Sequence, residues 1–524
     1  MVRLSSRKAR ANNSWCNWHL VYPVHILSGV FFATVRHSAG NKLSDTGVIL
    51  GLTGIRTSLI TAVACTILVL SACSEGPESP ATGANINRQA YEAVEQFSPT
   101  ILDSDLPERI DLRPYCPTPR EQGKQASCVG WATSYASRTI LRAIVTELPP
   151  DSIAFSPAFI YNQVKSSDCF SGALISEGLT LLADSGSITL SDFPYVEAYC
   201  DRLPTGLERT RARNFRIQGF ARLSGNRSFQ VDLLAIKQHL AQKRPVVIAM
   251  PVGGSFTDHS GEALWEPTQE DSDLLSRFRE GKRGEGELSG HAMTLVGYDD
   301  NLYGGSMLLM NSWGKDFGEN GFCWIRYTDF LNWCMEAYGI YPRPDERRNQ
   351  HLLSVSVGIR TSRKQYLPFG SYGARDFISR DILPPGEKFK LEISNSLPAY
   401  LYVFGRLADG GYEKIFPLDT TQTPYIGITG TRLLPVDYSY TLDNAGRSDE
   451  MLVILCDSLL NAEELARELG FPDSDPRKVV QQFAGRPLTA LDTEGVKEGD
   501  NRIISLQAEL EGLLLPIRLV IRKR

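Results

Sequence analysis

The C-terminal third of the chain alternates apolar and polar residues in short runs separated by turn signals. KFKLEI, AYLYVFGRL, EKIFPL, MLVILC and LPIRLVIRK read as strands, several with a period of two, and PPGE, ADGG and DNAG read as turns between them. Period-two alternation puts apolar side chains on one face of a sheet. One helix-like segment, SLLNAEELARELGF, interrupts the series. We therefore predict that residues 346–524 form a mostly β domain, a sandwich or a barrel.

The part before this domain has a different pattern, in which helix-like and strand-like segments alternate. A helical pattern runs from Cys128 to about Thr146. Two apolar, strand-like runs come later: one begins near His291 and the other ends at Asn311. This mixture predicts a separate α+β domain over residues 107–345.

Near the N-terminus, the uncharged apolar run Leu59–Leu70 follows Arg56 and precedes Ser-Ala-Cys73. It is shorter than the ~20 residues that a membrane-spanning helix needs. A basic flank, a short apolar run and small residues are typical of a secretory signal, although a core helix or a simple membrane anchor has a similar pattern. Leu-Ser-Ala-Cys73 also resembles the bacterial lipobox, whose Cys is lipidated. We predict a lipoprotein signal peptide at 48–72 and a flexible, Pro/Gly/Ser-rich tether at 73–106.

Residues 1–47 fit neither a signal nor a fold. Because a signal normally starts ~15–30 residues before its cleavage site, we predict an untranslated or disordered leader, with Val48 or Leu52 as the true start. The mature protein is then extracytoplasmic and lipid-anchored to a bacterial membrane. Ser74, which follows Cys73, favours the outer membrane in a Gram-negative host. A secreted or periplasmic protein is the second choice.

Composition narrows the function classes. The chain is 42% hydrophobic and 22% charged, as expected for a globular protein. A net charge of -5 and a pI near 5.9, without a basic and aromatic patch, argue against nucleic-acid binding. The ten cysteines form no CxxC pair and have no His at zinc-ligand spacing, so we predict neither a metal site nor a cofactor.

The segment around Cys128 has the features of a reactive thiol. A Gly-containing turn leads to Ser127-Cys128, and the predicted helix follows. At a helix N-terminus, unpaired N–H groups and the positive end of the dipole favour the thiolate, which lowers the thiol pKa below ~8.5. Taken alone, however, a Cys at this position is more often a buried structural residue.

Two further segments supply partners for this thiol. His291 begins the apolar run AMTLVGYD, and Asn311 begins the turn NSWGKDFGENG. A nucleophile and its base need only meet in space, and a third group must fix the tautomer of the imidazole. A core His and a turn Asn would explain each segment separately, but not all three together.

At this point the sequence, from Asp111 to Pro344, resembles the papain family of cysteine peptidases. The resemblance implies a two-lobed fold, with a helical lobe and a β-barrel lobe, that acts on polypeptide substrates. It assigns the nucleophile, base and orienting residue to Cys128, His291 and Asn311. Gln122, six residues before Cys128, would form the oxyanion hole with the Cys128 N–H. Trp313 would shield the bond between His291 and Asn311 from water.

The chain also departs from the family pattern. Val129 replaces the usual aromatic residue after the nucleophile, and Gln125 replaces a cysteine of one family disulfide. Cys169 and Cys200 fall where another family disulfide is expected. The long inhibitory pro-segment of the family is not recognisable before Asp111, so activation by removal of a large prodomain is not expected.

The resemblance also suggests how a substrate is recognised. It predicts an apolar pocket for the side chain two residues before the scissile bond, although the same residues would suit an ordinary core. The predicted lining consists of Leu174, Ile175, Ala249, Ala292 and Gly339. The long polar stretch between Pro251 and Leu288 leads directly to His291, so it borders the cleft or is a solvated insertion.

Two other functions remain open from the sequence. A thiol-dependent transpeptidase or acyltransferase would use the same residues and differ only in its acceptor. A non-catalytic surface binding protein on a papain-like scaffold would need none of them. For binding, the C-terminal β domain is the better candidate, with a protein or a glycan as its ligand.

Overall fold

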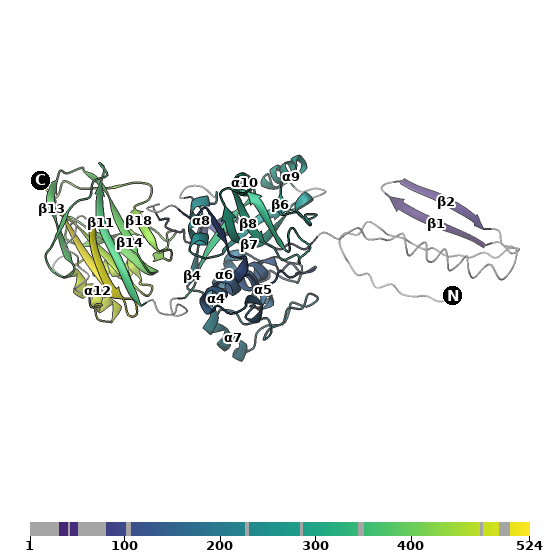
Figure 1. Cartoon of the computed structure of the whole chain (residues 1–524), viewed down its shortest axis with the longest axis horizontal. Coiled ribbons are helices and arrows are strands. Elements are labelled where there is room, and N and C mark those ends of the chain that lie inside the picture. The colour runs from purple at the N-terminus through teal and green to yellow at the C-terminus, as the bar shows by residue number, and fades with distance from the viewer. Residues whose placement is uncertain are drawn as a thin grey trace. The chain divides into compact units, whose positions relative to one another are not determined.

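A computed structural model describes most of the chain beyond the predicted signal (Figure 1). The described residues are 80–100, 106–225, 230–282, 287–343, 351–471, 475–491 and 503–524, together with the backbone of two earlier strands. The chain divides into two compact units, Met1–Glu78 and Ser79–Arg524. In the first, β1 (Phe31–Ala39) pairs antiparallel with β2 (Lys42–Leu50).

The predicted lipidation site, Cys73, lies outside the described residues, as does most of the predicted signal peptide. Both therefore stay predictions. Among the residues that are described, no helix is long and apolar enough to cross a bilayer.

One lobe of the second unit surrounds a long buried helix that begins at Cys128. The helix continues to Thr146, as predicted, and Val129 and Ile140 are fully buried within it. Its parts are α3 (Cys128–Gly130), the π-helical stretch η2 (Trp131–Arg138) and α4 (Thr139–Thr146). The lobe also contains α5 (Pro157–Val164), α6 (Ile175–Asp184), α7 (Gly206–Ala212) and the short turns η1 (Arg113–Tyr115), η3 (Pro150–Ser152) and η4 (Arg213–Phe215).

The other lobe is an eight-stranded, mostly antiparallel sheet in the order β4-β10-β5-β7-β8-β9-β6, with β3 paired to β7. Its strands are β3 (Arg109–Asp111), β4 (Gly219–Arg222), β5 (Val246–Val252), β6 (Leu264–Trp265), β7 (Ser289–Asp299), β8 (Ser306–Met310), β9 (Phe322–Arg326) and β10 (Glu336–Tyr341). Its helices are α8 (Leu233–Ala241), η5 (Gly254–Phe256), α9 (Gln269–Arg279), η6 (Leu302–Gly304) and α10 (Tyr327–Trp333).

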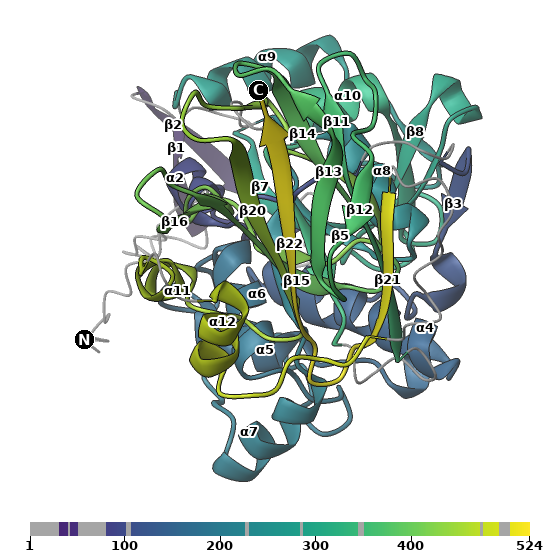
Figure 2. The ribbon, with the colours of Figure 1, turned by 90° about the vertical axis from the view of Figure 1, so that its left-hand side faces the viewer.

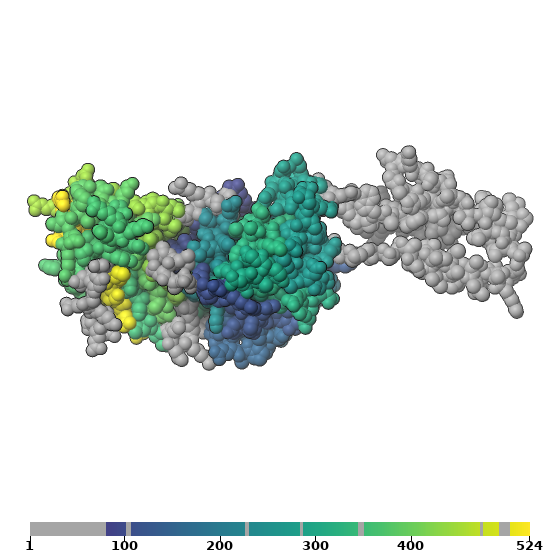
Figure 3. Space-filling model, turned by 45° about the horizontal axis from the view of Figure 1, so that its top comes forward, coloured from purple at the N-terminus to yellow at the C-terminus, as the bar shows by residue number. Residues whose placement is uncertain are grey.

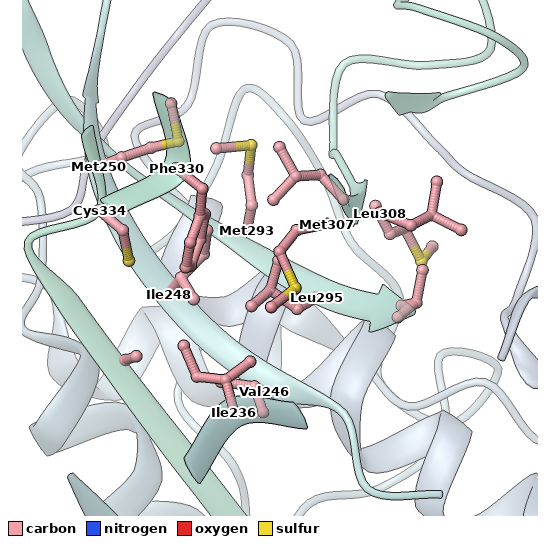
Figure 4. Close-up of a cluster of buried hydrophobic side chains, with 14 of the residues drawn as sticks. Ile236, Val246, Ile248, Met250, Met293, Leu295, Met307, Leu308, Phe330 and Cys334 are labelled. Carbon is pink, nitrogen blue, oxygen red and sulfur yellow. The ribbon is translucent and has the colours of Figure 1, made fainter. Parts of the chain in front are cut away.

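The core of this lobe is formed by strand side chains and by the helices that cover them. Figure 4 shows Ile248, Leu295 and Met307 from the central strands packed with Ile236 of α8 and Phe330 of α10. These five side chains are all fully buried. The core therefore holds β7, which carries His291 near its start, and β8, which ends just before Asn311, and this fixes the positions of both polar residues.

Two sheets make up the C-terminal domain, which is a sandwich (Figure 2). One has the order β18-β14-β11-β21, with β19 on β14, and the other β12-β13-β22-β20-β15-β16, with β17 on β15. The bounds are β11 (Leu352–Thr361), β12 (Phe369–Ser371), β13 (Asp376–Leu383), β14 (Lys388–Asn395), β15 (Ala399–Arg406), β16 (Tyr412–Phe416), β17 (Tyr425–Ile426), β18 (Gly430–Leu434), β19 (Tyr440–Thr441), β20 (Ser448–Cys456), β21 (Ile503–Glu509) and β22 (Leu514–Lys523).

Each strand expected from the alternation is present, and so is the predicted helix, α11 (Ala462–Glu468). A second helix, α12 (Pro476–Ala484), is not predicted by the sequence pattern. Apolar residues of both helices, such as Leu465 and Val480, pack with Tyr402 and Ile454 on the outer face of the second sheet. The two helices therefore cover the outer face of the second sheet. The alternating pattern of the strands alone predicts that this face is exposed to solvent.

Candidate active site

Cys128 is the first residue of its helix, and its side chain is fully buried. The backbone N–H of Ala292, the residue after His291, lies 3.4 Å from the sulfur atom. The thiol of the helical lobe therefore meets strand β7 of the sheet lobe at the point where the predicted base is located.

His291 is held by Asn311 and covered by Trp313. Asn311 Oδ1 lies 2.7 Å from His291 Nε2 and also accepts the backbone N–H of Ser312 at 2.7 Å. Because that amide oxygen is an acceptor, Nε2 must be the protonated nitrogen of a neutral ring, and Nδ1 keeps its lone pair. The Trp313 ring stacks on His291 at a centroid distance of 4.5 Å. Both rings are almost completely shielded from solvent.

Gln122 is buried beside this group, and its amide has a fixed orientation. Its Oε1 accepts the hydroxyl of Ser312 at 2.6 Å, and its Nε2 donates to the carbonyl of Gln125 at 2.9 Å. One N–H of Nε2 is thus committed, and the second is left for another acceptor. Tyr195, which the sequence analysis did not single out, donates to the Gln122 carbonyl at 2.7 Å and lies 2.8 Å from the Ser127 hydroxyl.

The disulfide between Cys169 and Cys200 is present, with an S–S distance of 2.04 Å, so this pairing is confirmed. It lies close to the thiol, because the Cys169 carbonyl accepts the N–H of Ala126, two residues before Cys128. The crosslink therefore fixes the loop that borders the start of the long helix.

The segment predicted as a flexible tether, 73–106, is ordered over residues 80–100, which we call the strap. The N–H groups of Gly83 and Ala84 donate to the Gly290 carbonyl at 3.1 and 2.9 Å. On the other lobe, Ala173 donates to Gly83 at 2.9 Å and accepts from Asn85 at 2.9 Å. The strap therefore lies across the cleft and is bound to both lobes, which corrects the prediction of a free tether.

Gly83 is required where the strap passes over the thiol. A Cβ on this residue would lie 2.1 Å from the carbonyl oxygen of Ala126, which is too close for any side chain. Two residues earlier in the strap, the Ala81 carbonyl accepts the indole N–H of Trp313 at 3.0 Å. A short segment thus covers the site, although no long pro-segment is recognisable in the sequence.

Burial under the strap sets the charge state of the pair. It raises the pKa of Cys128 to about 12, although the N–H groups of Ala292 and Gly83 act in the opposite direction. It also lowers the pKa of His291 to about 4, against the smaller effect of its bond to Asn311. Near neutral pH both groups are therefore uncharged. The expected lowering of the thiol pKa by the helix is outweighed by loss of water.

Three of the predicted pocket residues come together. Ile175, Ala249 and Ala292 share an apolar cluster with Cys128. Leu174 lies next to them as the residue that precedes α6, and it is half-buried. Gly339 does not join them: a Cβ there would point at the His239 ring, 2.3 Å from Nε2.

Glu336, Tyr338 and Ile340 are the alternate residues of β10 on the face toward this cluster. Glu336 pairs with Ala249 across the two strands. Its buried carboxyl accepts the Tyr338 hydroxyl at 2.8 Å and the N–H of Asn87 in the strap at 2.9 Å. Burial raises the pKa of Glu336 to about 7. Sequence alternation along Glu-Ala-Tyr-Gly-Ile-Tyr contained this signal, since alternate residues share a face.

The polar stretch before His291 does border the cleft, as one of the two interpretations expected. It folds into η5, β6 and α9, and α9 stands out at the surface of its lobe (Figure 3). Leu274 and Phe278 of α9 line a cavity of about 670 Å³ whose other walls include strap residues 82–86 and Phe170.

Comparison with known proteins agrees with this geometry. Residues 106–342 match the family described as papain family cysteine protease. The chain contains a papain-family cysteine protease domain. Cathepsin B-like CP2 of Giardia intestinalis is 24% identical to it over 231 residues, which are 43% of this chain and 70% of that protein.

Solved structures similar to the papain-family domain include xylellain, a cysteine protease from Xylella fastidiosa. It has 22% identity and a TM-score of 0.39, and the match covers 50% of this chain and 96% of that one. The bromelain protease from Ananas comosus, in complex with the E64 inhibitor, has 16% identity and a TM-score of 0.35, with 45% and 100% covered.

Proposed function

We propose that the chain hydrolyses peptide bonds with Cys128 as nucleophile, His291 as base and Asn311 as the residue that orients the base. The proposal rests chiefly on Asn311 Oδ1, which accepts one hydrogen bond from the Ser312 backbone N–H and a second from His291 Nε2. It commits Nε2 of His291 as a donor and leaves Nδ1 as the basic atom. Among the described residues this Nδ1 has no hydrogen-bond partner, although it is buried.

The proposed reaction follows from these positions once a substrate replaces the strap. Nδ1 of His291 takes the proton of the Cys128 thiol, and the thiolate attacks the scissile carbonyl carbon. The free N–H of Gln122 Nε2 and the Cys128 N–H stabilise the oxyanion. His291 then protonates the leaving amine, and a water molecule activated by the same ring hydrolyses the thioester.

Labelling with the epoxide inhibitor E-64 tests the proposal directly. We expect one equivalent to attach to Cys128, with loss of turnover of unstructured peptides, and no attachment in Cys128→Ala. Cys456, buried in the C-terminal domain, provides the control: Cys456→Ala should label normally. Labelling that persists in Cys128→Ala would overturn the assignment.

The same assay separates hydrolysis from acyl transfer. Adding a peptide with a free amino terminus should leave the hydrolysis product dominant if water is the acceptor. A ligated product that exceeds the hydrolysis product would instead favour the transpeptidase alternative. No turnover and no labelling of a folded protein from which the strap has been displaced would favour the non-catalytic binding protein.

We further propose that Cys73 carries lipid and anchors the protein outside the cytoplasm, with the outer membrane as the site in a Gram-negative host. The basis is the Leu-Ser-Ala-Cys73 sequence after a short apolar run. Expressed in bacteria with labelled palmitate, the full chain should incorporate label and sediment with membranes. Cys73→Ser should lose both properties, whereas Cys16→Ser should keep them. Equal labelling of the wild type and Cys73→Ser would contradict the proposal.

A further inference from the structure

The strap does more than cover the thiol, because three successive parts of it are bound to three different surfaces. Its first part, residues 80–86, bonds through its backbone to Gly290 on one lobe and Ala173 on the other. These are backbone groups on the two sides of the cleft, which an extended peptide substrate would also contact. Strap and substrate therefore compete for the same place.

The middle part, helix α2 (Arg88–Ala93), is docked on β10 of the sheet lobe. The Tyr91 hydroxyl donates to the Ala337 carbonyl at 3.1 Å, and its ring meets Tyr338 edge-on at 5.1 Å. Only 1% of Tyr91 is exposed. Just before the helix, the N–H of Asn87 reaches the Glu336 carboxyl. The buried tyrosine is thus the anchor of this part.

The last part, residues 95–100, lies between the protease domain and the C-terminal domain. On one side, Glu95 and Phe97 exchange backbone hydrogen bonds with Arg222 of β4 at 2.9 and 3.0 Å. On the other side, Gln96 donates to the Thr421 carbonyl at 2.5 Å and accepts the N–H of Thr423 at 3.1 Å. The strap here is a short strand shared by the two domains.

A second contact fixes the same end. Arg432 of the C-terminal domain is fully buried, and its Nε donates to the Ser98 carbonyl at 3.3 Å. Its other hydrogen bonds go to Asn395, Ile428 and Gly430 of its own domain. The position of the strap is therefore linked through Arg432 to the core of the β sandwich.

We propose that the C-terminal β domain is a regulatory domain that clamps the strap over Cys128, so that loosening the clamp opens the site without a cut in the chain. The inference rests on the proposed function, because opening the site affects activity only if Cys128 is the nucleophile. Access to the thiol can be measured independently of activity. Opening requires residues 80–94 to leave the cleft while 95–100 act as the hinge. A binding event that displaces Thr421–Thr423 would then act on the cleft.

The test uses the full chain and measures the rate at which iodoacetamide alkylates Cys128, located by mass spectrometry. Gln96→Pro removes the N–H that bonds to Thr421 and keeps the two backbone bonds of Glu95 and Phe97 to Arg222. It also loses the side-chain bonds of Gln96 to Ser224 and Arg222. Gln96→Ala is its matched control, because it loses the same side chain and keeps that N–H. We expect Gln96→Pro to alkylate about tenfold faster than Gln96→Ala, since the rate follows the fraction of open molecules.

A second pair of variants tests the middle of the strap. Tyr91→Ala should raise the alkylation rate by about tenfold or more, and Tyr91→Phe, which keeps the ring, by less. Glu92→Ala, on the exposed face of the same helix, should not change it. Unchanged unfolding temperatures confirm that each variant is folded, and Tyr91→Phe replaces Tyr91→Ala if the latter is not.

The outcomes distinguish this inference from the proposed function. Faster alkylation in Gln96→Pro and Tyr91→Ala, with or without peptide turnover, supports the clamp. Equal rates in Gln96→Pro and Gln96→Ala overturn it, even if the wild type hydrolyses peptides. Alkylation that appears only after a cut within residues 82–94 also overturns it, because opening would then depend on cleavage.

Discussion

Replacing His291 with Ala should lower kcat for peptide hydrolysis by about 10⁴-fold or more, with folding intact. Without Nδ1, no base accepts the thiol proton and no acid protonates the leaving amine. Cys128 and His291 are proposed to act together in one step, so removing either abolishes that step. The double variant with Cys128→Ala and His291→Ala should therefore have the same kcat as Cys128→Ala alone. Both are measured with a fluorogenic peptide in a Tyr91→Ala background, where opening of the strap does not limit the rate.

His351→Ala is the control for this prediction, because His351 is exposed in the C-terminal domain. It should have normal kcat. If His291→Ala kept more than about a tenth of the wild-type kcat, another group would have to be the base. If the double variant lost far more than Cys128→Ala, the two residues would not act as a unit.

The sequence predicted the positions of the candidate catalytic residues better than it predicted their protonation states. Cys128 at the start of a helix, and His291 and Asn311 at strand ends, could be placed because apolar periodicity defines where helices and strands begin. The pKa of the thiol could not be predicted, since it depends on which segment excludes water from the sulfur. That information lies in the tertiary structure.

The strap was missed for a related reason. Residues 80–87 are mostly small or polar, with Ile86 as the exception, a composition typical of a flexible linker. Their contacts with Gly290 and Ala173 use backbone atoms, which every residue type has. The pattern of side chains therefore does not predict these contacts. Gly83 was the one local signal, and its requirement is steric and visible only beside Ala126.

The error at Gly339 shows how sensitive strands are to register. Successive residues of a strand point to opposite faces. An error of one residue in the alignment therefore selects residues that point away from the pocket instead of into it. Gly339 faces His239, whereas Glu336 and Tyr338 face Ala249 and its neighbours. The predicted pocket residue Ala249 therefore has the Glu336 carboxyl group as its neighbour across the strands, which the prediction of an apolar lining did not include.

Replacing Gln122 with Ala should lower kcat by about 10²- to 10³-fold and leave KM nearly unchanged, because the proposed hydrogen bond forms only when the carbonyl oxygen becomes an oxyanion. Ser312 fixes the amide through its 2.6 Å bond to Oε1. Ser312→Ala should therefore cost less, about tenfold, since the amide stays in place but loses its orientation.

Alkylation separates this effect from damage to the nucleophile. Iodoacetamide needs the thiolate but no oxyanion hole, so Gln122→Ala in the Tyr91→Ala background should be alkylated at the rate of its parent. Gln163→Ala, a half-buried glutamine on α5, should change neither quantity. A parallel fall in alkylation and kcat would mean that Gln122 acts by positioning the loop before Cys128. Loss of kcat with normal alkylation would identify its side chain as the oxyanion donor.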